Sequence, residues 1–433
     1  MGNKVSIGLL GLGVVGTGVI KIIKDHQEKL VHQLGSDVQV KSALVRSLDK
    51  ERDVSLEGTL LTTNPDDILN DPEIDIIVEV MGGIDQTREY ILKAFSTKKH
   101  VVSANKDLVA LHGPELQEAA RKNKCDFYYE ASVAGGIPIL RGITEGLSSD
   151  RITKIMGIVN GTTNYILTKM DKEGSSYDVA LKQAQELGFA EADPTADVEG
   201  LDAARKMAIL ARLAFSMDVD LEDVKVKGIS NISLDDLKYA NKLGYTMKLI
   251  GNADFKDDKI EVDVQPTMLA KNHPLASVND EFNAVYVYGD AVGETMFYGP
   301  GAGSLPTATA ITSDVVSVIK NMLLGVTGSQ HLDPHFDKQL KTADKRFGQY
   351  YVRLHVKDEV GVFSRISALF NDLNISFKRI LQNPIIKDEN AEIIVVTHQT
   401  SLENFQTALN QLKDLDAVIE TKSYYKVEGD AEK

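Results

Sequence analysis

The feature that most constrains the fold is a glycine pattern near the start of the chain. Residues 5–10 form an apolar run, Gly11-Leu12-Gly13-Val14-Val15-Gly16 follows it, and helical spacing begins there. In such a strand–turn–helix unit the glycines permit a tight turn, close approach of the backbone to a pyrophosphate, and close packing of helix on strand. The sequence therefore predicts a dinucleotide site at a helix N-terminus, lined by Gly11, Gly13, Val14, Val15 and Gly16.

The pattern of elements changes twice along the chain. Short β-rich runs at 5–10, 38–45, 74–80, 100–104 and 126–131 alternate with helical patterns, which is typical of βαβ units and a parallel sheet. We therefore predict an α/β chain with a doubly wound Rossmann domain over residues 1–135. Residues 136–303 read as a separate α+β domain for substrate binding and dimerisation, with extended stretches such as 260–265 and 284–289. A helix in 304–328 is expected to return and complete the first domain.

The C-terminal third has its own plan. Residues 329–347 are polar and contain Pro334, as a linker would. Residues 348–428 then follow the order strand 350–356, helix 363–373, strand 375–381, strand 391–397, helix 402–412, strand 418–427. This is the βαββαβ order of a ferredoxin-like domain. Because the unit is complete, we expect that deleting it after about Lys345 exposes little of the catalytic core.

Composition narrows the class of partner. The net charge of −15 argues against nucleic acids and anionic membranes, and no apolar run approaches the ~20 residues of a membrane span. The single cysteine, Cys125, excludes an intramolecular disulfide, and we expect a buried, unreactive strand thiol. His331 and His335 flank Pro334, so a transition-metal site on a shared helical face is not expected. We predict a cytoplasmic protein that acts on small molecules.

Several residues are expected to line the cofactor crevice because they follow strands of the predicted parallel sheet. Ser103 and Lys106 come after the run at 100–104, and ligands bind at the carboxyl ends of such strands. Arg46 follows the second strand, where an NAD site usually carries an acidic residue. A guanidinium there pairs well with a 2′-phosphate, so NADP is favoured, while a solvated surface arginine and NAD remain open.

The most informative segment runs from Gly188 to Lys206. A carboxylate-rich loop leads into a helix, which Asp197 is placed to cap, and Asp202 and Lys206 are four residues apart on one helical face. The ordinary interpretation is a surface ion pair. However, an apolar stretch follows Lys206, and a buried lysine must be paired or have a lowered pKa, as proton transfer requires.

Five segments occur in the order found in homoserine dehydrogenases, and the chain resembles that family over nearly its whole length. They are the glycine pattern, Ser103 to Lys106, Glu130 to Pro138, Asn160 to Asn164, and Gly188 to Lys206. The resemblance implies reversible NAD(P)-dependent oxidation of L-homoserine to L-aspartate 4-semialdehyde, in the biosynthesis of threonine, methionine and isoleucine. It further implies a homodimer or homotetramer.

The resemblance also implies individual roles. Lys206 matches the proton donor and acceptor, Lys106 the lysine beside nicotinamide and substrate, and Glu191 the residue that holds the substrate's amino group. Asp197 and Asp202 match acidic neighbours of the site. Gly161 and Thr162 match a loop against the substrate, and Gly188 and Gly303 match cofactor contacts. Phe189 stands where some members have tyrosine. The resemblance also implies a bound monovalent cation, expected to be Na+. Its ligands in the family match Glu130, Val133, Gly135 and Ile137, and hard cations prefer oxygen ligands.

The turn from Asp358 to Phe363 resembles the ligand loop of ACT domains, which implies regulation by an amino acid, with L-threonine as the expected effector. A module used only for dimerisation is the alternative. Two rival functions remain: a regulatory protein that senses NADP and an amino acid without catalysis, and another amino-acid or hydroxy-acid dehydrogenase on the same scaffold. A regulatory protein without catalysis would have no use for Lys106, Glu191 and Lys206 together. A kinase fusion is not expected, because the chain begins at the first strand.

Overall fold

The computed structural model describes residues 4–329, 334, 336–385 and 390–431, so His331 and His335 lie outside the described residues. The chain divides into two compact parts, which we describe separately. The first part comprises Met1–Gly161, Asp202–Val224 and Glu281–Lys338, and the second Thr162–Leu201, Lys225–Asp280 and Gln339–Lys433. Among the described residues, no helix combines the length and apolar character needed to cross a membrane.

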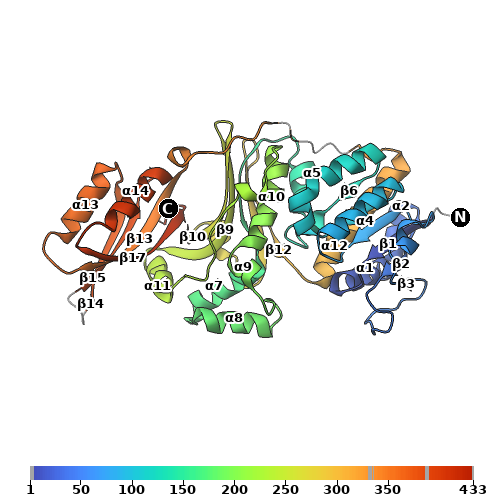
Figure 1. The fold of residues 1–433 in the computed structure, drawn as a ribbon, viewed down its shortest axis with the longest axis horizontal. Helices are drawn as coiled ribbons and strands as arrows, with labels where there is room; N and C mark the ends of the chain where they lie inside the picture. Colours follow the sequence, from blue (N-terminus) through green and yellow to red (C-terminus); the bar gives the residue numbers. More distant parts are fainter. Residues whose placement is uncertain (1–3, 330–333, 335, 386–389, 432–433) are drawn as a thin grey trace. The chain divides into compact units, whose positions relative to one another are not determined.

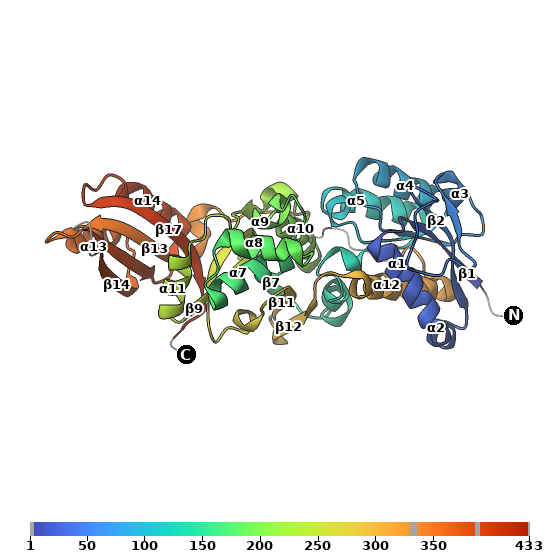
Figure 2. The same ribbon diagram turned by 90° about the horizontal axis from the view of Figure 1, so that it is seen from below.

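The first part contains the predicted Rossmann sheet. Six parallel strands lie in the order β3 (Leu60–Thr62), β2 (Asp37–Leu44), β1 (Lys4–Leu10), β4 (Ile76–Glu79), β5 (His100–Ser103) and β6 (Phe127–Tyr128). Figure 2 shows α1 (Val14–Asp25), α2 (Gln27–Leu34) and α12 (Ser304–Leu324) on one face, and α3 (Asp66–Leu69), α4 (Asp85–Ser96) and α5 (Lys106–Asn123) on the other. The strand order reverses between β1 and β4, where such sheets bind ligands.

Helix α12 completes this domain, as the sequence predicted. Its Ile311 and Val315 are fully buried in one cluster with Val19 of α1 and Ile7 of β1. Each such side chain contributes about 1.5–3 kcal/mol when removed from water. The two helices also approach closely at their start, because the hydroxyl of Ser304 donates to the Val14 carbonyl at 2.7 Å.

The rest of the first part includes three antiparallel strands, β7 (Ile152–Ile158), β11 (Phe282–Gly289) and β12 (Gly293–Pro300), which are part of a larger sheet. The other elements are short turns and one long helix: η1 (Glu130–Ser132), α6 (Ile139–Arg141), the π-turn η2 (Gly142–Gly146), α10 (Leu201–Phe215) and η3 (Leu221–Asp223). Cys125 is buried as predicted, although in the turn before β6 and not within a strand. Burial raises the pKa of its thiol to about 11.

The second part begins with helices and a long hairpin. Its first elements are α7 (Gly161–Glu173), α8 (Tyr177–Glu186), α9 (Thr195–Val198), β8 (Lys225–Val226), α11 (Leu234–Lys242), β9 (Tyr245–Lys256), β10 (Lys259–Ala270) and η4 (Pro274–Ser277). Strands β9 and β10 pair antiparallel along their whole length. The predicted stretch at 260–265 is therefore the first half of a twelve-residue strand.

The βαββαβ order at the C-terminal end is confirmed. The elements are η5 (Ala343–Lys345), β13 (Phe347–Lys357), α13 (Val362–Asp372), β14 (Phe377–Ile385), β15 (Asn390–Thr397), β16 (Thr400–Ser401), α14 (Leu402–Leu412) and β17 (Val418–Glu428). Figure 1 shows α13 and α14 covering the sheet of β13, β14, β15 and β17. Val352, Ile366, Phe370 and Phe405 belong to its buried core.

The last strand does not stay within this domain. Strand β17 pairs antiparallel with β13 on one side and parallel with β10 on the other, where Thr267, Met268 and Leu269 face Lys426, Val427 and Glu428. Deletion after Lys345 would therefore expose the edge of β10 and remove Arg346 and Lys426, the basic partners of Glu261 and Asp263. The expectation that this segment can be removed with little exposure of the rest is wrong at this junction.

Candidate active site

The glycine turn has the geometry that a pyrophosphate site requires. Gly11 has φ of +104°, which a side chain would strain, and Gly13 is the residue preceding α1. A Cβ on Gly16 would lie 2.3 Å from the carbonyl oxygen of Gly11, so close packing excludes any side chain there. At Gly13 a Cβ would meet no atom within 4 Å, which leaves the space before the helix N-terminus open.

The neighbouring strand ends are tied together by Glu79, a buried carboxylate at the end of β4. It accepts hydrogen bonds from the hydroxyl of Ser103 at 2.6 Å and from the amides of Met81 and Gly82. Burial raises the pKa of Glu79, and these hydrogen bonds oppose the shift. The Ser103 hydroxyl in turn accepts from the amide of Asn105, whose side chain caps α5. Because Lys106 is the first residue of α5, this chain of bonds fixes the backbone of Lys106.

Two lysines meet around one carboxylate. Lys206 on α10 donates to Oδ2 of Asp202 at 2.7 Å and to the carbonyl of Val159 at 2.7 Å, and Lys106 Nζ lies 3.1 Å from Asp202 Oδ1. The Asn160 amide also donates to Asp202 at 2.9 Å. The side chains of Asp202 and Lys206 are 7% and 13% exposed, so this is not the surface ion pair of the alternative interpretation.

Charge at this cluster is unbalanced. Burial alone would raise the pKa of Asp202, but Lys206 and Lys106 outweigh burial and hold that pKa well below its usual range. One carboxylate therefore faces two ammonium groups. A lysine charge held beside the substrate oxygen can stabilise negative charge that develops on that oxygen.

Side chains that sequence reasoning missed hold α10 against α5. Arg205 pairs with Asp107 at 2.7 Å, and the buried guanidinium of Arg212 donates to the carbonyls of Val109 and Ala110. These contacts fix the helix that carries Lys206 to the helix that begins with Lys106. Nothing local in the sequence could have revealed them, because the partners lie about a hundred residues apart.

The predicted substrate residues of the second part form a group of their own. The Thr162 hydroxyl donates to the Phe189 carbonyl at 2.5 Å and to Asp197 at 3.2 Å. Asp197 does not lie directly before α10. It lies on α9, a separate short helix that ends at Val198, and Gly200 with φ of +81° turns the chain before α10. Glu191 is an exposed residue of the same loop.

The two remaining cofactor matches and the substrate glycine also lie at turns. Gly188 has φ of +77° and Gly303, which precedes α12, has φ of +114°, both in the left-handed region that favours glycine. A Cβ on Gly161 would lie 2.6 Å from the Glu281 carbonyl oxygen. Arg46 is exposed just after β2, and its position does not distinguish the two interpretations made above.

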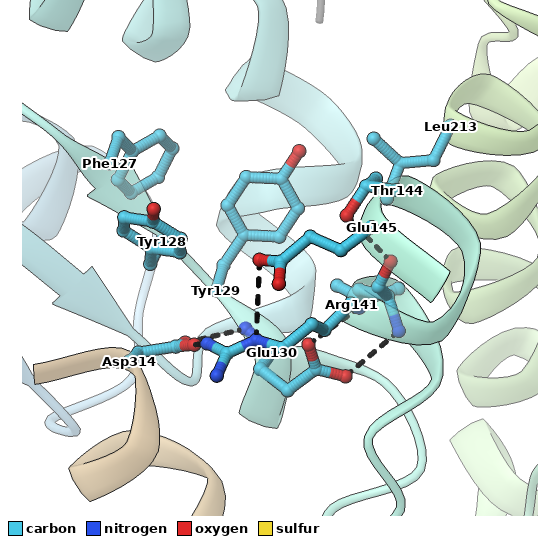
Figure 3. Close-up of a pocket in the computed structure, with 10 residues that line it drawn as sticks. Phe127, Tyr128, Tyr129, Glu130, Arg141, Thr144, Glu145, Leu213 and Asp314 are labelled. Carbon is cyan, nitrogen blue, oxygen red and sulfur yellow. Dashed lines mark hydrogen bonds and ion pairs between the residues drawn. The ribbon is translucent and has the colours of Figure 1, made fainter. Parts of the chain in front are cut away.

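The loop after β6 is held by buried side chains. The carboxylate of Glu130 accepts the amides of Leu140 and Arg141 at 2.8 Å, while Asp314 of α12 accepts the Glu130 amide at 2.9 Å and the Arg141 guanidinium at 2.7 Å (Figure 3). Burial and the neighbouring Glu130 raise the pKa of Asp314 to about 8, and Arg141 opposes the shift. Asp314 and Arg141 were not identified from the sequence.

The same loop contains the four residues matched to a cation. Val133 and Ile137 are buried, and Ala134 and Gly135 between them have φ of +55° and +50°, so the backbone is irregular there. A Cβ on Gly135 would lie 2.4 Å from the Gly301 carbonyl oxygen. The described residues contain no cluster of three or more His, Cys, Asp and Glu side chains suited to a metal ion. Any ion held here would depend on backbone oxygens.

A Rossmann sheet with an open glycine turn, and two lysines around a buried carboxylate, define an NAD(P)-dependent oxidoreductase. Family models agree: residues 11–130 match the NAD-binding domain of homoserine dehydrogenase, residues 138–316 its catalytic domain, and residues 350–417 the ACT domain. A homoserine dehydrogenase of Bacillus subtilis is 61% identical over 99% of both chains. One of Synechocystis is 43% identical over 98% of this chain and 99% of the relative.

Solved structures agree with these relatives. A homoserine dehydrogenase from Thiobacillus denitrificans superposes with a TM-score of 0.93 at 39% identity and 99% coverage of both chains. One from S. aureus has a TM-score of 0.79, also at 39% identity, with 99% of both chains covered. The chain belongs to the homoserine dehydrogenase family, so the predicted oxidoreductase function is confirmed and neither rival is supported.

Proposed function

We propose that the protein catalyses the reversible oxidation of L-homoserine to L-aspartate 4-semialdehyde with NADP, in the biosynthesis of threonine, methionine and isoleucine. The observation that carries this proposal is the buried cluster of Lys206, Lys106 and Asp202. A regulatory protein without catalysis would have no use for two lysines around one buried carboxylate. A cytoplasmic location fits the single buried cysteine and the acidic charge.

In this mechanism Lys206 transfers the proton. The bound cofactor supplies the acceptor or donor of hydride. In the reductive direction Lys206 donates a proton to the aldehyde oxygen. In the oxidative direction it releases its own proton to solvent and then accepts the proton of the substrate hydroxyl. Asp202 and the Val159 carbonyl hold Nζ in place, and Lys106 adds positive charge that stabilises the developing alkoxide.

The substrate's polar end is assigned to the second part. By the family pattern, Glu191 holds the amino group and the loop at Gly161 and Thr162 lies against the substrate, with Asp197 behind it. The hydrogen bonds of Thr162 to Asp197 and Phe189 support a fixed loop. The exposed carboxylate of Glu191 suits an ammonium ligand, since no burial penalty has to be overcome before binding.

NADP is the proposed cofactor. The open space at Gly13 and the N-terminus of α1 suit the pyrophosphate, and the exposed Arg46 suits the 2′-phosphate. A hyperthermophilic archaeal homoserine dehydrogenase, 26% identical with 73% of this chain covered and a TM-score of 0.62, is described in complex with NADPH. Gly188, Gly303 and Ser103 complete the proposed cofactor contacts.

A monovalent cation, Na+, is proposed at the loop of Glu130, Val133, Gly135 and Ile137. The donor set fits, because carbonyl oxygens are hard ligands and the left-handed residues at 134 and 135 turn the backbone. The Glu130 carboxylate accepts two amides at 2.8 Å, whereas its carbonyl accepts one, from Val133, at 3.3 Å, so the carbonyl is proposed as the ligand. The ion would stabilise the segment that leads from β6 to α6.

The C-terminal domain is proposed to bind L-threonine as an effector, with the turn from Asp358 to Phe363 as the ligand loop implied by the ACT family. The protein is proposed to form a homodimer or homotetramer. An effector acts only as far as it binds one activity state better than the other.

A substrate screen that follows NADPH absorbance tests the catalytic proposal. L-homoserine with NADP should give the fastest turnover among small amino and hydroxy acids, and L-aspartate 4-semialdehyde should be reduced in the opposite direction. Faster turnover of a different alcohol or amine would replace the proposed substrate, and binding of NADPH without any turnover would favour the regulatory alternative.

A further inference from the structure

A cavity in the second part lies where β10 meets the C-terminal domain. It offers about 80 Å³ to the centres of water-sized molecules, opens partly to solvent, and lies between β10, the start of β13, α14 and β17. Its lining has a charged side and an apolar side. The charged side consists of Glu261, Arg346 and Lys426, with the neutral amides of Gln265 and Gln406 also in the lining, and the apolar side consists of Phe347, Tyr350, Leu402, Phe405, Leu409 and Tyr424.

The charged side is balanced. Arg346 Nε lies 2.9 Å from Glu261 and its terminal nitrogen 3.7 Å from Asp263, while Lys426 Nζ lies 3.7 Å from both carboxylates. Burial alone would lower the pKa of Lys426, but Asp263 and Glu261 outweigh burial and raise it, so Lys426 is held in its charged form. Two positive and two negative charges leave no net attraction for a simple anion or cation.

Although these charges balance, a positive and a negative group of the cluster can each still form hydrogen bonds with a ligand. At 3.7 Å the contacts of Lys426 are ion pairs but not hydrogen bonds, so its ammonium retains donors. Glu261 uses Oε2 for Arg346, whereas Oε1 has only the distant Lys426. Asp263 differs, because Gln265 and Asn252 already donate to it. The donors and the acceptor that remain are therefore those of Lys426 and Glu261.

The apolar side offers an ordered surface. The rings of Tyr350 and Phe405 are stacked with centroids 4.1 Å apart, and Tyr424 meets Phe405 edge-on at 6.2 Å. Phe405 and Leu409 are buried on the inner face of α14, whose first amide donates to the Arg346 carbonyl. A small aliphatic side chain placed against this wall would lose water contact without displacing a polar group.

We propose that this cavity binds a small zwitterionic amino acid, with its carboxylate on Lys426, its ammonium on Glu261, and its side chain against Tyr350 and Phe405. A zwitterion carries both charges, so it can pair with the basic and the acidic side chains of this cluster at once. A simple anion or a simple cation can pair with only one of them. The site is separate from the loop at Asp358 to Phe363. The inference rests on the proposed regulation by an amino acid and gives that effector a location.

The location also gives the ligand a route to the rest of the molecule. Glu261 and Asp263 belong to β10, Lys426 belongs to β17, and the two strands share a parallel ladder from Thr267 to Leu269. A ligand that draws Lys426 and Glu261 toward itself alters the ion pairs between β10 and β17 at this junction. Binding in the cavity is therefore coupled to the strand that joins the C-terminal domain to the hairpin of β9 and β10.

Isothermal titration calorimetry on the full-length protein tests the site, with L-threonine, L-isoleucine and L-methionine as probes and with acetate and ethylamine as one-charge controls. We expect at least one amino acid to bind at millimolar concentration or tighter, and the controls to bind at least tenfold more weakly. Lys426→Met should weaken binding about tenfold or more, because a charged hydrogen bond is lost. Lys422→Met, on the same strand and paired only with Glu420 in the described residues, should leave binding unchanged.

A second pair of variants avoids the charged cluster, in case Lys426→Met fails to fold. Gln406→Trp would block the cavity, whereas Gln411→Trp alters an exposed residue of α14 outside its lining. Only the first should abolish binding. Binding that survives Gln406→Trp but is lost in Val360→Trp places the effector at the loop of Asp358 to Phe363 and overturns the cavity site. Absence of amino-acid binding also overturns it, and homoserine turnover in the same samples shows separately whether the proposed catalytic function stands.

Discussion

Replacing Lys206 with alanine tests the proton carrier directly. The substitution removes two charge-assisted hydrogen bonds of 2.7 Å, to Asp202 and to the Val159 carbonyl, from a side chain that is 13% exposed. A general acid–base group contributes about 10²–10⁴-fold to rate, so kcat should fall by that factor in both directions. Cofactor affinity should stay near normal, because no cofactor contact is assigned to Lys206.

The Lys206→Ala substitution should also lower the free energy of unfolding, by an amount that follows from the contacts that Asp202 keeps. Breaking a buried ion pair costs about 3–5 kcal/mol when the remaining charge is left alone. Here Asp202 keeps Lys106 at 3.1 Å and the Asn160 amide at 2.9 Å, so we expect about 2–3 kcal/mol. Circular dichroism at the assay temperature must show that the variant is folded before its kcat is interpreted.

The control is Arg205→Ala on the same helix. It removes the ion pair with Asp107 that ties α10 to α5, but it leaves the proton carrier in place. Stopped-flow reduction of L-aspartate 4-semialdehyde should show Arg205→Ala within about tenfold of the wild type, far above Lys206→Ala. A folded Lys206→Ala enzyme with near-normal kcat, or an equal loss in both variants, would refute the assignment.

Four further expectations can be measured independently. Arg46→Ala should weaken NADPH binding much more than NADH binding, and equal losses would reduce Arg46 to a surface residue. Deletion of the chain from Tyr350 should remove threonine inhibition but also lower thermal stability, because the edge of β10 loses β17; an unchanged melting temperature would contradict this junction. Cys125, with a pKa raised to about 11, has about one thiol in a thousand ionised at pH 8, so iodoacetamide should label it only after unfolding. Asp202 has a lowered pKa in the folded protein, so it stabilises the protein above its unfolded pKa and ceases to do so as pH falls through the folded pKa. The difference in stability between the wild type and Asp202→Asn, measured by acid unfolding, should therefore narrow below about pH 4.

Local patterns predicted the parts of the fold that depend on neighbours in sequence. The glycine turn, the alternation of the Rossmann strands and the βαββαβ order all follow from spacing within a few residues. The i,i+4 spacing of Asp202 and Lys206 predicted their ion pair for the same reason. Strand β3 was missed because it has only three residues, too few for a periodic signal.

The partners that complete the site could not be predicted, because they come from distant segments. Asn160 meets Asp202 across 42 residues, and Asp314 meets the Glu130 amide across 184. Asp314 sits on a helix whose pattern indicates only an apolar face, so its burial beside Arg141 carries no local signal. Such residues become visible only when the chain has folded and brought the two segments together.

The C-terminal junction shows why a polar linker is weak support for an independent domain. Composition at 329–347 reports only that this segment is polar, whereas the connection that matters is made by β17, about eighty residues later. That strand joins β10 by a ladder and by the contacts of Lys426 with Glu261 and Asp263. An effector bound in this domain changes activity only through its different affinity for two states. The β10–β17 junction links the effector domain to the β9–β10 hairpin, alongside contacts such as that of Arg379 with the Tyr245 ring, so a difference between those states should be measured at this junction first.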